Sequence, residues 1–455
     1  MAYLDNNVTN VAIPTIQRNL HLSVAGLEWV VSSYLLTLAG LLLVGGRLAD
    51  VFGRRRMFLG GLALFTVSSL AAGLASSGSV LIASRAVQGV GAALLMPTTL
   101  AIIMAAFTDP AERNRAIGVW TAIGAMALGL GPVVGGLISQ HIRWGWIFLI
   151  NVPVGVITFV LALPFMRESK ASSALYPGGG RAAGRSLDVP GLLTSALSLF
   201  ALTYALIEGG YKGWTSAQIL GSFAVAAVAA AAFITIELRA AHPMVDLQMF
   251  RMRQFSGGTG TMMIWAFGIL GIYFFTSLYL QGILGFSPTK AGLAFVPMAL
   301  TLAVFAGVAP LVESRIGAHR AVALGMVMMV VGLALFVRFG EHASYAALMP
   351  GFLVFGAGAG LMNVPLTNAV MHATPQSRAG VAGALLNDSR EVAGLLGITI
   401  IGAVLSARQS AALRAGSTRA QAFVTGYHTG LWVTIALLAA GAVLSYLTLR
   451  PAETH

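Results

Sequence analysis

Runs of about 20 apolar residues follow one another along almost the whole chain, and this pattern limits the fold more than any other feature. A helix needs about 20 such residues to cross a membrane. We expect fourteen spans, at residues 1–16, 28–46, 57–76, 80–106, 115–139, 147–166, 188–208, 216–237, 254–282, 289–312, 320–338, 345–372, 380–406 and 426–449. The predicted fold class is therefore an all-α polytopic membrane protein, because backbone polar groups inside lipid must be hydrogen-bonded within their own segment.

The composition agrees with this fold class. Of the 455 residues, 57% are hydrophobic and 9% are charged, whereas soluble domains carry about 25% charged residues. The lipid bilayer is therefore the expected solvent of most of the surface.

The basic residues predict the orientation in the membrane. If the connection around Gln17–Leu27 faces outward, 17 of the 27 Lys and Arg residues lie in inner segments and eight in outer ones. The other two, Arg85 and Arg390, fall within spans. Since basic residues concentrate in cytoplasmic loops, both termini are expected inside, in the cell inner (plasma) membrane. The net charge of +12 thus reflects topology, and we expect no nucleic-acid partner.

Several other classes of site are excluded by residue content. The chain has no cysteine, and no two of its eight histidines have metal-ligand spacing, so no metal site is expected. The three lysines are followed by Ala171, Gly213 and Ala291, so the Gly-Lys-Ser/Thr end of a nucleotide-binding loop is absent. We expect no nucleotide, no cofactor and no enzymatic activity.

The longest polar connection, Arg167–Leu187, contains a Pro-Gly-Gly-Gly run and is typical of a flexible linker. It divides the chain into a six-helix half at 1–166, a linker with two extra spans at 167–249, and a second six-helix half at 250–455. The first span is short and polar. This indicates either that an upstream half-helix is missing or that a short helix is shielded by its neighbours.

The two halves look like repeats of each other. Residues 46–56 (GRLADVFGRRR) correspond to residues 310–320 (PLVESRIGAHR), and Gly89, Gly91 and Pro97 correspond to Gly356, Gly358 and Pro365. A repeat of six-helix halves is typical of transporters whose substrate site lies between the halves.

Residues 46–56 resemble the motif between helices two and three of the major facilitator superfamily. The matching positions are Gly46, Asp50, Gly53, Arg54 and Arg55. The resemblance implies a conformational role, in which Gly46 lets helices approach, Asp50 pairs with an arginine or caps a helix, and the arginines latch the halves. Ser314 replaces the aspartate in the second half, so we expect a one-sided latch.

Two further motifs carry the same resemblance. Residues 81–92 (LIASRAVQGVGA) are similar to the helix-four motif, whose arginine, here Arg85, the resemblance links to proton coupling. Gln88 is expected to be a packing residue. Residues 131–136 resemble the helix-five motif of antiporters, through Gly131, Pro132, Gly135 and Gly136.

Residues 4–14 (LDNNVTNVAIP) resemble the helix-one motif of the fourteen-helix drug:proton antiporters, to which the chain is similar over nearly its whole length. Asp5, Asp388 and Glu391 are acids that fall within spans. Asp388 and Glu391 are three residues apart and so share a helix face. With Arg85, these acids are the expected proton-coupling residues. The alternative is that Asp388, Arg390 and Glu391 form a structural ion-pair network or line a wet cavity.

The expected function is export of small hydrophobic or cationic drugs or secondary metabolites in exchange for protons, by alternating access. Proton-coupled uptake of a nutrient or siderophore is the alternative on the same fold. A membrane sensor that does not transport is a third possibility.

Overall fold

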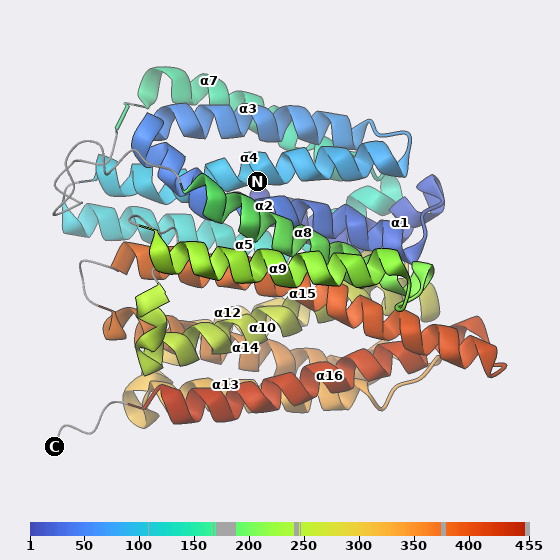
Figure 1. Cartoon of the computed structure of the whole chain (residues 1–455). Helices are drawn as coiled ribbons and strands as arrows, with labels where there is room; N and C mark the ends of the chain where they lie inside the picture. The colour runs from blue at the N-terminus through green and yellow to red at the C-terminus, as the bar shows by residue number, and fades with distance from the viewer. Residues whose placement is uncertain are drawn as a thin grey trace. The chain divides into compact units, whose positions relative to one another are not determined.

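The computed structural model describes residues 1–107, 109–166, 168–169, 188–240, 245, 247–374 and 379–450. These residues form α-helices with two short 3-10 and π segments, and there is no strand among them (Figure 1). Most of the linker at 167–187 lies outside the described residues.

The chain forms two compact units, each described here by itself. Unit 1 comprises Met1–Gly131 and Ile138–Asp246. Its helices are α1 (Ala2–Leu20), α2 (Val24–Phe52), α3 (Arg54–Gly73), α4 (Gly78–Ala106), α5 (Pro110–His141), α6 (Trp146–Leu149), α7 (Asn151–Phe165), α8 (Val189–Lys212) and α9 (Ala217–Arg239). Within it α4 packs between α2 and α3, and α8 packs on α2 and α9 (Figure 1).

Unit 2 comprises Pro132–Leu137, a short piece of α5, and Leu247–His455. Its other elements are η2 (Leu247–Arg251), α10 (Arg253–Leu278), η3 (Tyr279–Ile283), α11 (Pro288–Ala294), α12 (Val296–Ile316), α13 (Ala318–Phe336), α14 (Tyr345–Ala373), α15 (Ala379–Arg414) and α16 (Arg419–Thr448). Within it α14 packs on α12 and α13, and α16 packs on α13 and α15.

Each of the fourteen expected spans coincides with a helix or with two consecutive helical segments. Twelve of these are long and apolar enough to cross a membrane, counted over the described residues. The other two positions are α1 and α5. In α1, Asp5, Asn6 and Asn7 lower the hydropathy, yet Val11, Ala12 and Ile13 are fully buried, so neighbouring helices shield it.

The internal repeat is visible at the turns between helices. Gly53 joins α2 directly to α3 with a φ of 116°, and Gly317 joins α12 to α13 with a φ of 81°. Positive φ is readily adopted only by glycine. The same one-residue turn thus occurs at corresponding positions of the two motifs.

The repeat is also visible in helix packing. A Cβ on Gly89 would collide with the Tyr34 carbonyl of α2, and a Cβ on Gly91 would lie 2.7 Å from the Phe65 nitrogen of α3. In unit 2, Gly356 faces Met298 of α12 in the same way, and Gly358 faces Gly325 of α13. In each unit one helix, α4 or α14, therefore approaches its two neighbours closely at two glycines that are two residues apart.

Candidate proton-coupling site

Asp5 lies in the interior of unit 1, where its carboxylate is fully buried and forms an ion pair with Arg85 of α4. The other carboxylate oxygen, Oδ1, accepts hydrogen bonds from Gln88 Nε2 at 2.9 Å and from Asn151 Nδ2 at 2.8 Å. Two helices, α4 and α7, therefore supply donors to one acid of α1.

Arg85 is fully buried and makes contacts beyond its ion pair with Asp5. Its Nε donates to the Val30 carbonyl at 3.1 Å, and its Cζ lies 4.2 Å from the centre of the Tyr34 ring. Its Nη2 has no hydrogen-bond partner among the residues described. A buried charge of this kind is stable only while it is paired, so the state of Asp5 controls the stability of Arg85 in its place.

Gln88 connects this pair to α3. Its Oε1 accepts from Arg85 Nη1 at 2.6 Å, and its Nε2 donates to Ser69 Oγ at 2.8 Å. The expectation that Gln88 only packs was wrong, because its amide contacts both charged partners. Its position one helical turn after Arg85 was the available signal, since residues three apart share a face. Asn151 and Ser69 had no such signal.

Protonation of Asp5 would remove the negative charge that holds Arg85. Arg85 would then keep only neutral acceptors, Gln88 Oε1 and the Val30 carbonyl. The arrangement can thus convert the uptake of one proton into the release of a buried cation.

Asp388 and Glu391 lie on α15 in unit 2. Glu391 Oε1 accepts from Arg390 Nη2 at 2.7 Å, and Glu391 is buried. Arg390 therefore pairs with the residue next to it on the same helix. Asp388 Oδ1 is buried without a hydrogen-bond partner in the described part of the chain. The structural ion-pair reading therefore fits Glu391 but does not account for Asp388.

The loop between α2 and α3 is held together by contacts within unit 1. Asp50 pairs with Arg54 at 3.2 Å, and Arg54 Nη1 also donates to the Ala101 carbonyl at 3.2 Å. Arg55 Nη2 donates to the Leu163 carbonyl at 2.6 Å. Of the two roles expected for Asp50, pairing with an arginine is the one observed.

The N-terminus of α3 is capped by Glu168, which sequence reasoning missed. Its two carboxylate oxygens accept from the backbone nitrogens of Arg55 at 3.0 Å and Arg56 at 3.3 Å. A Cβ on Gly53 would lie 2.5 Å from this carboxylate. Glycine at position 53 thus serves both the turn and the cap.

The close approach of α2 and α4 occurs one residue before the expected position. A Cβ on Gly45 would collide with the Ala93 carbonyl, whereas a Cβ on Gly46 would lie 3.6 Å from Pro97 Cβ, an ordinary contact. Gly46 was therefore the wrong residue for that role.

The glycines of residues 131–136 also lie at close contacts. A Cβ on Gly131 would be 2.6 Å from Asn7 Cβ in unit 1, and one on Gly136 would collide with the Pro288 carbonyl in unit 2. Pro132 is inside α5, and Gly135 is buried. The absence of a side chain at Gly131 and Gly136 thus lets this segment pack closely on its neighbours.

Comparison with known proteins decides the family. The profile of the Major Facilitator Superfamily matches residues 1–398. The chain belongs to the Major Facilitator Superfamily. The predicted family is thereby confirmed.

Curated relatives in this superfamily include proteins of drug resistance. The chain is 37% identical to the multidrug resistance protein Stp of Mycobacterium tuberculosis, over 92% of this chain and 76% of that protein. It is 34% identical to the tetracenomycin C resistance and export protein of Streptomyces glaucescens, over 90% of this chain and 74% of that protein. It is 36% identical to the methylenomycin A resistance protein of Streptomyces coelicolor, over 89% and 83%.

Solved structures share the facilitator fold. A bacterial homologue of the human lysosomal transporter Spinster, solved inward-facing and unoccupied, has a TM-score of 0.67 at 16% identity, covering 98% of this chain and 95% of that one. An auto-inhibited peptide transporter of the POT family has a TM-score of 0.65 at 16% identity, covering 100% and 97%.

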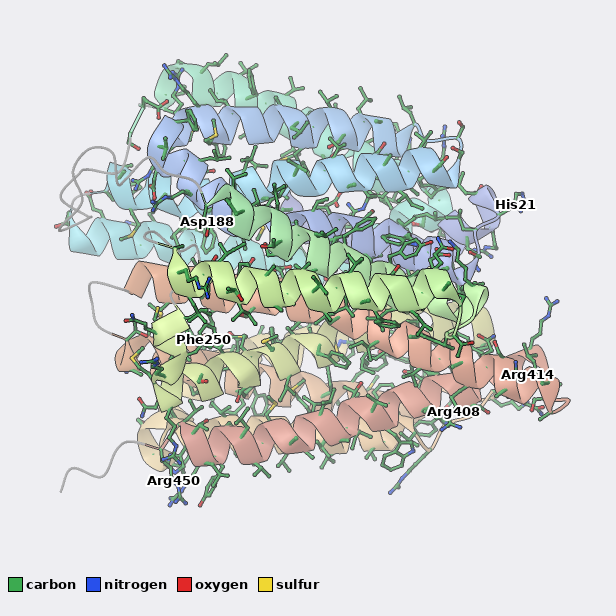
Figure 2. The ribbon with its side chains drawn as sticks, viewed as in Figure 1. His21, Asp188, Phe250, Arg408, Arg414 and Arg450 are labelled. Carbon is green, nitrogen blue, oxygen red and sulfur yellow. The ribbon has the colours of Figure 1, made fainter. Side chains whose placement is uncertain are left out.

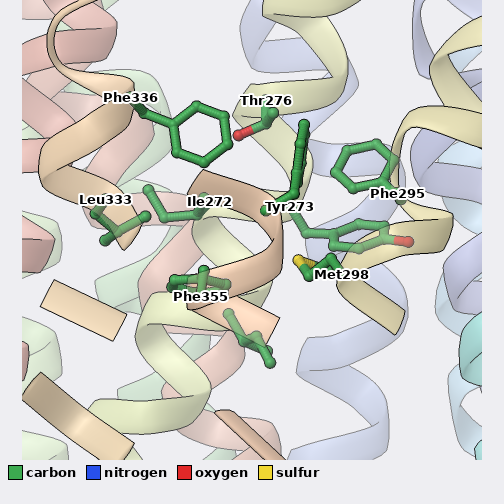
Figure 3. Close-up of a pocket in the computed structure, with 10 residues that line it drawn as sticks. Ile272, Tyr273, Thr276, Phe295, Met298, Leu333, Phe336 and Phe355 are labelled. Carbon is green, nitrogen blue, oxygen red and sulfur yellow. The ribbon is translucent and has the colours of Figure 1, made fainter. Parts of the chain in front are cut away.

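Unit 2 of this facilitator protein also contains an aromatic pocket (Figure 3). Its lining includes Tyr273, Phe295, Phe336 and Phe352, and Tyr273 stacks on Phe295 with ring centres 4.2 Å apart. We assign no ligand to it.

Proposed function

We propose that this protein exports small hydrophobic or cationic drugs, or secondary metabolites, in exchange for protons. The observation that carries the proposal is the fully buried pair of Asp5 and Arg85, which lies in a transport fold and can respond to a single proton. The relatives are named for drug resistance or export, and this supports export as the direction.

The coupling follows from competition between a proton and Arg85 for the buried carboxylate of Asp5. When Asp5 is protonated from the outer side, Arg85 loses its partner, and this change favours a different arrangement of unit 1. Release of the proton inside restores the pair. Substrate and proton then affect each other's binding reciprocally, which is the thermodynamic requirement for coupled transport. Asp388 and Glu391 are a second acid pair that can serve the same purpose in unit 2.

Asp50, Arg54, Arg55 and the turn glycine Gly53 form the proposed conformational element, with the antiporter-like segment at 131–136. Asp50 and Arg54 are partly exposed and close the loop between two helices. A rearrangement of α2 relative to α3 would have to break that pair.

We propose fourteen membrane spans, with α1 and α5 added to the twelve apolar helices, in the bacterial inner membrane with the C-terminus cytoplasmic. Within unit 2, Arg408 and Arg414 lie at one end, and Phe250 and Arg450 lie at the other (Figure 2). The excess of basic residues in the predicted inner segments supports placing Arg450 inside. Small molecules, protons and lipid are the proposed partners, without nucleotide or nucleic acid.

The first test is efflux of ethidium from energised cells, with and without a protonophore. Export that the protonophore stops, and that Asp5→Asn removes while Glu341→Gln does not, is the expected result. Glu341 lies in the loop after α13 and belongs neither to the Asp5 network nor to the pair of Asp388 and Glu391. Accumulation of the dye above its level in cells without the protein would instead indicate uptake, and no change of any kind would contradict dye export.

A further inference from the structure

The first turn of α13 in unit 2 is the counterpart, in the internal repeat, of the first turn of α3 in unit 1. The start of α3 is capped by the carboxylate of Glu168, which accepts from the backbone nitrogens of Arg55 and Arg56. Gly317 precedes α13 as Gly53 precedes α3, but no side chain from the described part of the chain caps α13. A helix start with open N–H groups attracts an anion. The repeat therefore indicates where an anion would bind in unit 2.

His319 lies against this helix start. A Cβ on Gly317 would stand 3.2 Å from its Nδ1 atom. In unit 1 the Glu168 carboxylate takes the corresponding place beside Gly53. His319 Nδ1 is buried and has no hydrogen-bond partner among the residues described. Because an imidazole can donate through one ring nitrogen even when it is uncharged, the ring offers an unused polar group at the place where unit 1 holds a carboxylate.

Two arginines add positive charge to this place. Arg320 and Arg450 lie close enough to His319 for their charges to act on it. Arg450 Nη2 donates to the Tyr446 hydroxyl at 2.6 Å, its Cζ lies 4.5 Å from the centre of that ring, and the same ring is 5.6 Å from that of His319. Both arginines are exposed, and within the described residues neither forms an ion pair.

The acid that lies nearest to Gly317 along the chain is engaged elsewhere. Glu313 of α12, four residues before this glycine, accepts a hydrogen bond from Asn368 Nδ2 of α14 at 3.0 Å. Two positive charges, an open helix start and an imidazole without a partner therefore meet here, and no acid from the part of the chain that the structure describes pairs with them.

The exposed face of α16 leads from the apolar part of unit 2 to this cluster. Val443 and Leu447 are exposed, as is Tyr446. Together with Arg450 they recur every three or four residues, so they follow one face. This face is apolar toward the middle of the helix, aromatic near its end and basic beyond it. Arg253 of α10 adds a third arginine at the same end, because its guanidinium donates to the Leu447 carbonyl.

We propose that the start of α13, with His319, Arg320 and Arg450, binds the phosphate group of an anionic phospholipid. The open backbone N–H groups and His319 Nδ1 donate to the phosphate oxygens, and the two arginines supply charge-assisted hydrogen bonds. The acyl chains lie along the apolar face of α16. In the orientation proposed above the site is at the cytoplasmic surface of the membrane, where anionic lipids attract basic residues. The inference goes beyond the proposed export and does not depend on it.

Binding of fluorescently labelled dioleoylphosphatidylglycerol to the full chain in dodecyl maltoside micelles, followed by fluorescence anisotropy, tests this inference. Arg320→Gln and Arg450→Gln should each raise the dissociation constant about fivefold, the usual effect of one basic residue on binding to an anionic membrane surface. The double variant should raise it about 25-fold if the two residues act independently. Arg414→Gln is the matched control, because Arg414 is an exposed arginine at the other end of unit 2 (Figure 2), and it should leave the affinity unchanged.

His319→Phe separates a defined site from a general attraction of positive charge. This change keeps a ring beside Gly317 but removes both ring nitrogens, and it should raise the dissociation constant about fivefold through the loss of one hydrogen bond. Native affinity in His319→Phe would overturn the role of the imidazole. Arg320 and Arg450 are exposed, so the comparison of their variants holds even where His319→Phe fails to fold.

Equal affinities of the native chain and the double variant would overturn the proposal, as would an equal loss in Arg414→Gln. Unlabelled dioleoylphosphatidylcholine, whose headgroup has no net charge, should displace the label much less than unlabelled dioleoylphosphatidylglycerol does. Equal displacement by the two lipids would also overturn the proposal. Displacement by inorganic phosphate at the same concentrations as dioleoylphosphatidylglycerol would assign the site to free phosphate and overturn the choice of a lipid.

Discussion

Asn151 of α7 donates a hydrogen bond of 2.8 Å to Asp5 of α1, across 146 positions of sequence. Gln88 of α4 donates a second one to the same oxygen at 2.9 Å. Both donors are neutral amides on helices other than that of the acid. The position of the Asp5 carboxylate is therefore set by α1, α4 and α7 together.

Removing one of these donors should weaken proton-driven transport. In Asn151→Ala the Oδ1 atom of Asp5 keeps one donor instead of two, so the carboxylate is held less firmly in its place beside Arg85. We expect the rate of proton-driven exchange in proteoliposomes to fall about tenfold, for a hydrogen bond worth about 1.4 kcal/mol.

The matched control is Asn19→Ala. The Asn19 amide donates only to the Thr15 carbonyl of its own helix and is exposed. Its rate of proton-driven exchange should equal that of the native protein. A loss of equal size in both variants would contradict the role of the hydrogen bond from Asn151 to Asp5.

Gly45 and Gly46 should differ strongly when each is replaced by alanine. Gly45→Ala places a methyl group against the Ala93 carbonyl, so α2 and α4 must move apart. We expect a loss of about 1–3 kcal/mol in stability, as for other overpacked positions. Gly46→Ala meets only an ordinary contact and should leave the apparent melting temperature in detergent nearly unchanged. A larger loss of stability in Gly46→Ala than in Gly45→Ala would show that α2 and α4 do not approach each other at Gly45.

Glu168 should matter more to the loop between α2 and α3 than Arg56 does. Glu168→Ala leaves the backbone nitrogens of Arg55 and Arg56 without their acceptor and is expected to cost about 1 kcal/mol. Arg56→Gln removes only an ion pair of 3.8 Å from a side chain that is 73% exposed, and should cost little. Thermal unfolding of both variants checks the difference, and equal losses would contradict the capping role.

The positions of the helices could be predicted from the sequence because hydropathy acts locally. The span expected at 320–338 is α13, Ala318–Phe336, and the span expected at 345–372 is α14, Tyr345–Ala373. The polar first span is a helix as well, although its hydropathy is low. Hydropathy alone does not determine the number of spans, because a polar helix such as α1 depends on its neighbours for shielding.

The candidate site could be predicted only as separate residues. Asp5 and Arg85 are each unusual in an apolar helix, which is why both were expected to have a role. Their pairing depends on how α1 and α4 pack, and no local pattern encodes a contact between residues 80 positions apart. For the same reason the sequence could not distinguish Gly45 from Gly46, or identify Glu168 as the acid that caps α3.

The most direct test of the coupling role of Asp5 uses purified protein in proteoliposomes with an imposed pH gradient and equal concentrations of ethidium on both sides. The native protein should accumulate the dye against its gradient as protons move the opposite way. Asp5→Asn should abolish this accumulation yet still exchange dye down a concentration gradient. Accumulation by Asp5→Asn at the native level would contradict the assignment of the buried pair of Asp5 and Arg85 as the proton-coupling site.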